Sequence, residues 1–304
     1  MHILKGYTKQ EISWMMYDWA NSAHSVIIVT LLPIFFDTVA GYTADSVSSM
    51  STWGYATSIA MLIVALAAPF LGVFGDIRGM RKKLFSFFML LGVAACAGMA
   101  FTPGMDFTSG PVAAGKVASL ILVLYIVSVI GFDASAIYYD AFLTDVTTED
   151  RMDKVSTMGY GLGYIGGSTI PLLIFLIMNL VGVPMLTCLA FVFGLTAVWW
   201  LAFSLPLLKN CEQTSGKPYE KGDVARSIKG VGTTIKEIIA NKPMLIYILS
   251  YFFYIDGVHT VISMATTYGT NLGLDSTGMM LALLLVQILG LPFCICSSAS
   301  LRSL

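Results

Sequence analysis

Apolar runs long enough to cross a lipid bilayer recur along the whole sequence. A helix needs about 20 apolar residues to span the hydrocarbon core. Eight segments of the chain meet this requirement: 12–36, 54–74, 84–104, 117–140, 157–181, 184–206, 243–267 and 277–297. Within lipid every backbone polar group must be bonded inside the protein, and helices achieve this in single segments. The sequence therefore predicts an all-α polytopic membrane protein of about eight transmembrane helices.

Charged residues are few and are sorted between the two ends of these helices. Only 12% of the residues are charged, against about 25% in soluble domains. With the N-terminus inside, sixteen of the 17 Lys and Arg residues fall in inner segments, and only Lys116 falls outside. Basic residues favour the cytoplasmic side, so we predict a cytoplasmic (inner) membrane protein with its N-terminus inside. The net charge of −1 says nothing about partners, since the charges are sorted by side and not in excess; we expect the lipid bilayer as surroundings and no nucleic-acid partner.

One long polar segment, residues 209–242, divides the chain. Its second half places Ile228, Val231, Ile235 and Ile239 on one face at helical spacing, which predicts an amphipathic helix. Such a helix lies either on the inner membrane surface or beneath the bundle, and the pattern leaves both open. Helix starts are marked by a capping box at 8–11 and by Asn-Lys-Pro at 241–243.

The chain on the two sides of that segment is similar in sequence. The tetrapeptide at 24–27, His-Ser-Val-Ile, matches His-Thr-Val-Ile at 259–262, and Pro-Phe at 69–70 matches Pro-Phe at 292–293. Repeats of this kind are typical of two-bundle transporters. We therefore predict a six-helix N-terminal bundle at 1–208, a cytoplasmic linker with an amphipathic helix at 209–242, and the first two helices of a second bundle at 243–304. A complete second bundle needs about four further helices, so the sequence reads as C-terminally truncated.

A glycine-rich, charged turn separates the second and third predicted spans. It reads Gly-x-x-x-Asp-x-x-Gly-x-Arg-Lys-x-Leu over residues 72–84. This spacing resembles the signature loop between helices 2 and 3 of major facilitator superfamily transporters. The resemblance implies a gating loop formed by Gly72, Asp76, Gly79, Arg81 and Lys82.

Two further segments resemble one branch of that superfamily. These are 14–23, Trp-Met-Met-Tyr-Asp-Trp-Ala-Asn-Ser-Ala, and 138–167, which opens Tyr-Tyr-Asp-Ala-Phe-Leu-Thr-Asp-Val. Together they look like the vacuole effluxer-like family, whose eukaryotic members export amino acids from vacuoles. The resemblance implies a secondary active transporter of a small solute, with amino acids and efflux as the family-level expectation, working by alternating access between two bundles. The second segment also carries Asp140, Asp145 and Arg151, which we assign to an inner gate.

Polar residues inside the predicted spans are the candidates for binding solute or protons. A charged group at mid-bilayer costs about 2.5–3.5 kcal/mol on insertion scales, so intramembrane acids indicate function. Helical spacing groups some of these residues on one face of the first span and others on one face of the seventh. A histidine can titrate near neutral pH, which predicts proton coupling through a histidine. The candidates are Asp18, Asn21 and His24 in the first span, Asp133 in the fourth, and Asp256, His259 and Thr260 in the seventh.

Other motifs in the sequence bear on alternative functions. The sequence Gly-x-Gly-x-x-Gly at 161–166 follows no strand and lies in an apolar span, so it indicates close helix contact and bending, not nucleotide binding. An intramembrane aspartyl hydrolase is disfavoured because Asp133 and Asp140 lie about 10 Å apart on one helix. The five cysteines show no metal-ligand spacing, and we expect no metal, no cofactor and no enzymatic activity. The alternative to a transporter is a non-transporting remnant or partner subunit of a membrane complex, and a truncated chain is expected to self-associate.

Overall fold

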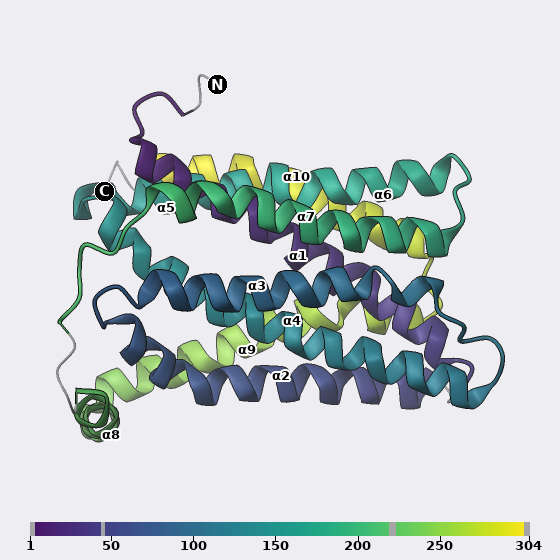
Figure 1. Cartoon of the computed structure of the whole chain (residues 1–304), viewed down its shortest axis with the longest axis horizontal. Coiled ribbons are helices and arrows are strands. Elements are labelled where there is room, and N and C mark those ends of the chain that lie inside the picture. The colour runs from purple at the N-terminus through teal and green to yellow at the C-terminus, as the bar shows by residue number, and fades with distance from the viewer. Residues whose placement is uncertain (1–3, 44–45, 219–222, 301–304) are drawn as a thin grey trace.

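The structure is a computed structural model that describes residues 4–43, 46–218 and 223–300. Those residues form an almost entirely helical chain (Figure 1). The helices are α1 (Lys9–Ala40), α2 (Ser46–Gly75), α3 (Arg81–Met99), α4 (Pro111–Val146), α5 (Met152–Leu162), α6 (Ile170–Leu180), α7 (Met185–Asn210), α8 (Asp223–Ala240), α9 (Lys242–Asn271) and α10 (Ser276–Ser300). A π-helix, η3 (Gly163–Thr169), joins α5 to α6. Short 3-10 turns, η1 (Thr102–Gly104) and η2 (Glu149–Arg151), precede α4 and α5.

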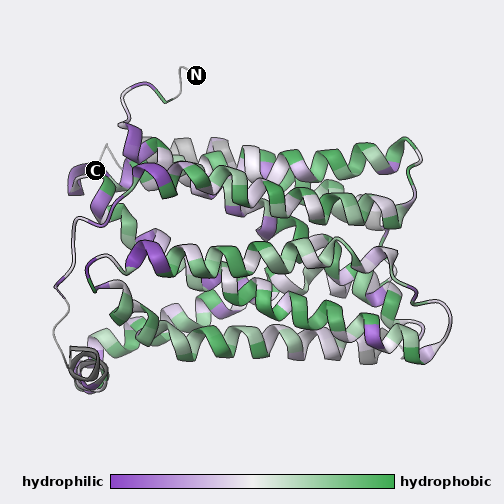
Figure 2. Cartoon of the chain, in the orientation of Figure 1, coloured by the Kyte–Doolittle hydropathy of each residue, from purple (hydrophilic) through white to green (hydrophobic). Residues whose placement is uncertain are grey.

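Among the described residues, seven helical stretches are long and apolar enough to cross a membrane. They include α1, α2, α4, α7 and α9, α3 extended to Gly104, and the stretch Glu149–Leu180 that contains α5, η3 and α6. The eighth predicted span lies within α10, where a shorter apolar stretch, Thr277–Gly290, is found. Hydrophobic residues dominate the helices, while hydrophilic ones gather at the end of the bundle where α3 and α5 begin (Figure 2). The all-α membrane fold is therefore as the sequence predicts. Residues 219–222 of the predicted linker and 301–304 of the predicted second bundle lie outside the described residues.

The predicted helix starts at α1 and α9 are confirmed by their capping bonds. Thr8 accepts from the backbone N–H of Glu11 at 3.1 Å, and the Glu11 carboxylate accepts from the backbone N–H of Thr8 at 2.7 Å. Asn241 accepts from the N–H of Met244 at 3.3 Å, with Pro243 in the first turn of α9. Both caps satisfy amides that a helix start leaves without a partner.

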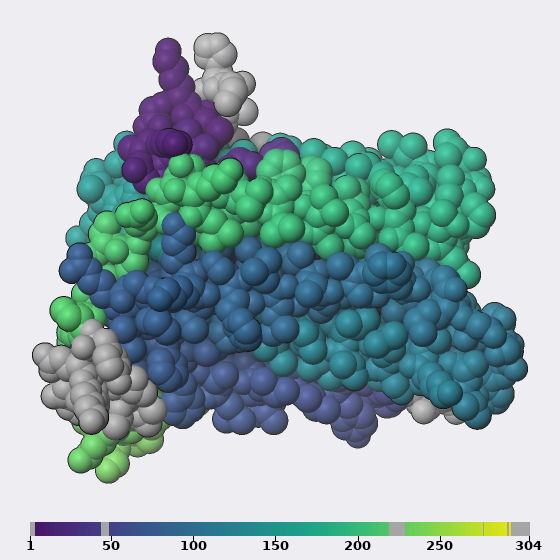
Figure 3. Space-filling model, viewed as in Figure 1, coloured from purple at the N-terminus to yellow at the C-terminus, as the bar shows by residue number. Residues whose placement is uncertain are grey.

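Helix α1 lies at the centre of the molecule and α9 at its surface. In its most apolar window α1 is 78% buried, whereas α9 is 0% buried and α2 is 11% buried. Helix α1 contacts α2, α4, α5, α6, α7 and α9, and α3 packs along both α4 and α7. On the face seen in Figure 3 the surface of α3 lies between those of α7 and α4. Large apolar side chains are exposed along α2 and α9, as a lipid-facing surface requires.

Helix α8 crosses the end of the bundle. Figure 1 views it almost end-on, while the spanning helices run across the picture. It contacts α2 and α9, and its Ile235 and Ile239 are 51% and 58% exposed.

The glycine run of α5 and η3 makes the close helix contact that the sequence predicts, and its partner is α1. A Cβ atom added at Gly163 would lie 2.5 Å from the Ser22 hydroxyl and 3.2 Å from a backbone oxygen of α1. At Gly166 and Gly167 it would overlap Trp19 of the same helix. The predicted bend takes the form of the π-helix itself, which ends just before Pro171.

Candidate functional site

Asp18 lies inside the six-span part of the molecule. It is 7% exposed and accepts a hydrogen bond of 2.7 Å from the Tyr139 hydroxyl of α4. Trp14 holds Tyr139 in place, because its ring stacks on the tyrosine at 4.3 Å and its indole N–H donates to the Tyr139 carbonyl at 2.9 Å. Gly159 of α5 leaves the space that the Asp18 carboxylate occupies. The acid is therefore positioned by three helices and bonded to a neutral donor.

Asn21 and His24 are buried as well, 8% and 2% exposed. The His24 ring stacks on Phe132 of α4 at 4.8 Å and lies 5.1 Å from the ring of Trp200 of α7. Neither of its ring nitrogens has a hydrogen-bond partner among the described residues. Ser25, by contrast, is exposed. The polar stripe of α1 thus faces mainly its own bundle.

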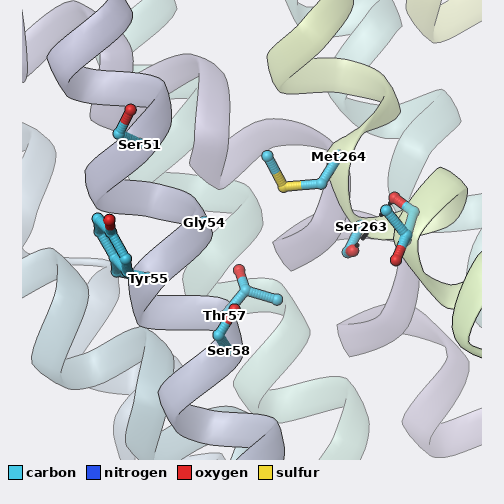
Figure 4. A pocket seen from close by; sticks show the side chains of 8 residues that line it. Ser51, Gly54, Tyr55, Thr57, Ser58, Ser263 and Met264 are labelled. Carbon is cyan, nitrogen blue, oxygen red and sulfur yellow. Dashed lines mark hydrogen bonds between the residues drawn. The ribbon is translucent and has the colours of Figure 1, made fainter.

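The polar residues of α9 lie in a different place. Asp256, His259 and Thr260 are all exposed. Thr260 contributes to a cavity of about 370 Å³ between α2 and α9. Its lining residues are Ser51, Gly54, Tyr55, Thr57, Ser58, Thr260, Ser263 and Met264 (Figure 4).

Both walls contribute hydroxyl groups to that cavity, and none of its lining residues is charged. Thr57 donates to the Trp53 carbonyl at 3.1 Å, and its hydroxyl lies 3.1 Å from that of Tyr125. Ser263 donates to the His259 carbonyl at 2.8 Å. These intrahelical bonds leave lone pairs that can accept from a solute. Among the predicted site residues, only Thr260 is placed in this cavity.

The acids of α4 are dispersed along that helix. Asp133 is partly buried, and its Oδ2 atom is buried without a partner in the described structure. Asp140 is exposed. Asp145 is the third, near the end of α4, and its side chain is fully buried.

Asp145 and Arg81 form a buried ion pair at this end of the bundle. Arg81 donates through Nη1 to the Asp145 carboxylate and, at 3.0 Å, to the Ala141 carbonyl. The Arg81 side chain is 5% exposed, and its guanidinium also lies over the Phe142 ring at 5.7 Å. Asp76 is 4.0 Å from the guanidinium but 83% exposed. Arg81 of the predicted gating loop therefore contacts Asp145 of the predicted inner gate.

The remaining loop residues have distinct surroundings. Lys82 donates to the Cys211 carbonyl at 3.1 Å. Gly79 has φ +81°, which favours glycine there, and Gly72 has open space where a Cβ would lie.

Arg151 pairs with Glu11 and not with Asp145. Its guanidinium donates to both oxygens of the Glu11 carboxylate at 2.8 Å, and the Thr147 hydroxyl donates to the same carboxylate at 2.7 Å. The Glu11 side chain is 2% exposed. The start of α1 is thereby bound to the junction of α4 and α5. Sequence reasoning identified Glu11 only as a capping residue and did not find this pair.

These features define a class of protein: a multi-pass transporter of the major facilitator type, with an ion-paired loop at one end and a cavity between α2 and α9. The crystal structure of a D-xylose-proton symporter has the same fold, with a TM-score of 0.61 and 14% sequence identity, covering 97% of this chain and 69% of that one.

Sequence comparison then gives the family. Residues 7–150 and 144–299 match the family described as vacuole effluxer Atg22 like, and the chain belongs to that family. An uncharacterized MFS-type transporter, YxiO, from Bacillus subtilis (strain 168) is 39% identical over 301 residues, which are 96% of this chain and 68% of the relative. Autophagy-related protein 22-1 of Penicillium rubens is 26% identical over 148 residues, 45% of this chain and 25% of that protein. Membership of this transporter family agrees with the prediction that the chain is not an enzyme.

Proposed function

We propose that the chain moves a small solute by secondary active transport, with residues 1–208 and 243–304 belonging to two bodies joined by the linker 209–242. The cavity between α2 and α9 carries this proposal. It lies between the first body and the second, and hydroxyls of both line it. Its volume of about 370 Å³ is at the lower end of the range for small-molecule sites, about 300–1,000 Å³. A solute held by both walls would be released when one body moves against the other.

Amino acids are the substrate class we propose, exported and coupled to protons. Asp256 and His259 are exposed on α9 beside the cavity residue Thr260. An aspartate can pair with an ammonium group, and an imidazole can exchange a proton near neutral pH. His24 supports this role less, since it is enclosed by aromatic rings. We also propose an inner-membrane location with the N-terminus inside. In that orientation the exposed isoleucines of α8 would contact the lipid headgroup region of the inner surface.

Counterflow in proteoliposomes tests the proposal. Vesicles loaded with a mixture of unlabelled amino acids should accumulate labelled ones when the purified protein is present, and an imposed pH gradient should increase the uptake. Thr260→Val should reduce uptake several-fold because it removes a hydroxyl from the cavity. Thr270→Val is the matched control, since Thr270 lies on the same helix and its hydroxyl donates within α9 to the Thr266 carbonyl. Uptake equal to that of empty vesicles for every amino acid would reject this substrate class.

A further inference from the structure

The segment that leaves α7 binds back onto the charged loop between α2 and α3. Gln213 makes the central contact. Its side-chain oxygen accepts from the backbone N–H of Gly79 at 2.8 Å and of Arg81 at 3.3 Å, and its side-chain nitrogen donates to the Gly75 carbonyl at 3.0 Å. Gly75 is the last residue of α2 and Arg81 the first of α3. One amide therefore binds the end of one helix and the start of the next.

This amide replaces a cap that α3 does not have. The N-cap residue of α3 is Met80, whose side chain makes no capping bond. A helix start leaves its first amides without an intrahelical partner. Gln213 supplies the missing acceptor from 132 positions further along the chain.

Backbone bonds extend the contact beyond Gln213. The N–H of Lys217 donates to the Asp76 carbonyl at 3.1 Å, and the N–H of Arg78 donates to the Lys217 carbonyl at 3.0 Å, so that Ile77 and Lys217 form a parallel bridge. Gly216 has φ +115°, and a Cβ there would lie 2.8 Å from the Asp76 carbonyl oxygen. The close approach of the two chains therefore requires glycine at this position.

The same segment also binds the end of α4. The backbone N–H and hydroxyl of Thr214 and of Ser215 all donate to Oδ1 of Asp145, at 2.7–3.0 Å. The other carboxylate oxygen accepts from Arg81. We call residues 212–217 the linker latch, since they join the α2–α3 loop and the α4 end to the linker.

Two properties distinguish the latch from the ion pair beneath it. Thr214, Ser215 and Lys217 are exposed, so water can reach their donor groups. The Arg81 and Asp145 side chains are buried. The chain also continues from the latch to α8, which contacts both α2 and α9, so a movement of α9 relative to α2 can reach the latch through α8.

We infer that the linker latch is closed in this structure and opens when α9 moves relative to the first six spans, which makes Gln213 a positioning residue for the loop. This inference rests on the proposed function in assuming movement between two bodies, but its test needs no substrate. A closed latch should hold the α2–α9 cavity as it is seen here, and a broken latch should let the cavity close part of the time.

Cysteine cross-linking of the bridge tests this directly. The five native cysteines are replaced, and Ile77→Cys with Lys217→Cys is oxidised in lipid nanodiscs to close the latch. Paired strands lie about 4.8 Å apart, within the Cα separations that a disulfide spans. The readout is the rate at which maleimide labels Ser263→Cys, a half-buried residue of the cavity wall. In the oxidised protein the two cysteines of the pair do not react with maleimide, because their thiols are consumed by the disulfide bond.

We expect the cross-linked protein to label at position 263 about tenfold faster than Gln213→Ala carrying the same reporter, and a reductant to return it to the parent rate. Ser109→Cys, in an exposed turn away from the cavity, should label equally in all variants. Equal rates at position 263 in the cross-linked, reduced and Gln213→Ala proteins would show a static brace and overturn the inference. Failure of the pair to cross-link would contradict it as well. Absence of amino-acid counterflow would reject the proposed substrate and leave this result unaffected.

Discussion

Replacing Gly131 of α4 with alanine should force α3 and α4 apart. A Cβ at that position would lie 2.5 Å from the Gly92 nitrogen, 2.7 Å from the Gly92 Cα and 2.8 Å from the Phe88 carbonyl oxygen. All three are backbone atoms of α3, so no side-chain rotation can relieve the overlap. Ordinary contact begins near 3.4 Å, and the helices must therefore separate by several tenths of an ångström or more.

The expected magnitude combines two opposing effects. Overpacking a well-packed interface costs about 1–3 kcal/mol. Gly131→Ala should lie near the upper end of this range, because the added Cβ would overlap backbone atoms. Alanine recovers about 1 kcal/mol of helix propensity over glycine, which leaves a net loss of about 2 kcal/mol. Gly115 lies on the same helix with no atom within 4 Å of an added Cβ. Gly115→Ala should therefore gain up to about 1 kcal/mol, so the two variants should differ by about 3 kcal/mol.

Equilibrium unfolding in mixed micelles measures this difference. Purified parent, Gly131→Ala and Gly115→Ala are titrated with sodium dodecyl sulfate and followed by circular dichroism and by tryptophan fluorescence. The two probes should give the same transition if unfolding is two-state. A Gly131→Ala protein that unfolds at the same detergent fraction as Gly115→Ala would refute the claim that the backbones of α3 and α4 touch at Gly92.

Three further outcomes follow from the charged contacts and the α9 stripe. Asp145→Ala should destabilise the protein by about 3–5 kcal/mol because it leaves Arg81 buried without its partner; unfolding at the parent detergent fraction would contradict this. Arg151→Ala should cost less, since the arginine is partly exposed, and the same titration measures it. His259→Ala should abolish pH-driven flux while insertion into the membrane stays intact, and an unchanged pH dependence would remove His259 from the mechanism.

The sequence predicts the helices of this protein well because each depends on local information. An apolar run of bilayer length is sufficient to indicate a span, and Thr8 with Glu11 marks the first residue of α1 to within a turn. The glycine run at 159–167 likewise indicates a close helix contact, although it does not say that α1 is the partner. The α3–α4 contact at Gly92 and Gly131 was not predicted, since single glycines in apolar spans are common.

The contacts of the candidate site depend on residues far apart in the chain. Glu11 and Arg151 are 140 positions apart, and Gln213 lies 134 positions from Gly79. A polar, glycine-containing stretch such as 213–218 has the composition of a linker whether or not it binds elsewhere. Helical spacing does place residues on shared faces, but it does not identify the neighbour of each face. His24 illustrates this limit, because its packing against Phe132 and Trp200 depends on helices α4 and α7.

The intramembrane acids separate into two kinds according to what satisfies them. Asp18 accepts a hydrogen bond from a buried tyrosine and lies where glycines leave space for it. Its carboxylate therefore has a hydrogen-bond partner within the protein, without a solute. Asp133 has a buried oxygen with no partner among the described residues, and Asp256 is exposed on α9. A charged group at mid-bilayer costs about 2.5–3.5 kcal/mol on insertion scales, so an acid whose own protein leaves it without a donor favours binding of a proton or a solute. We therefore propose Asp133 and Asp256 as the first positions at which to test for a proton or a solute.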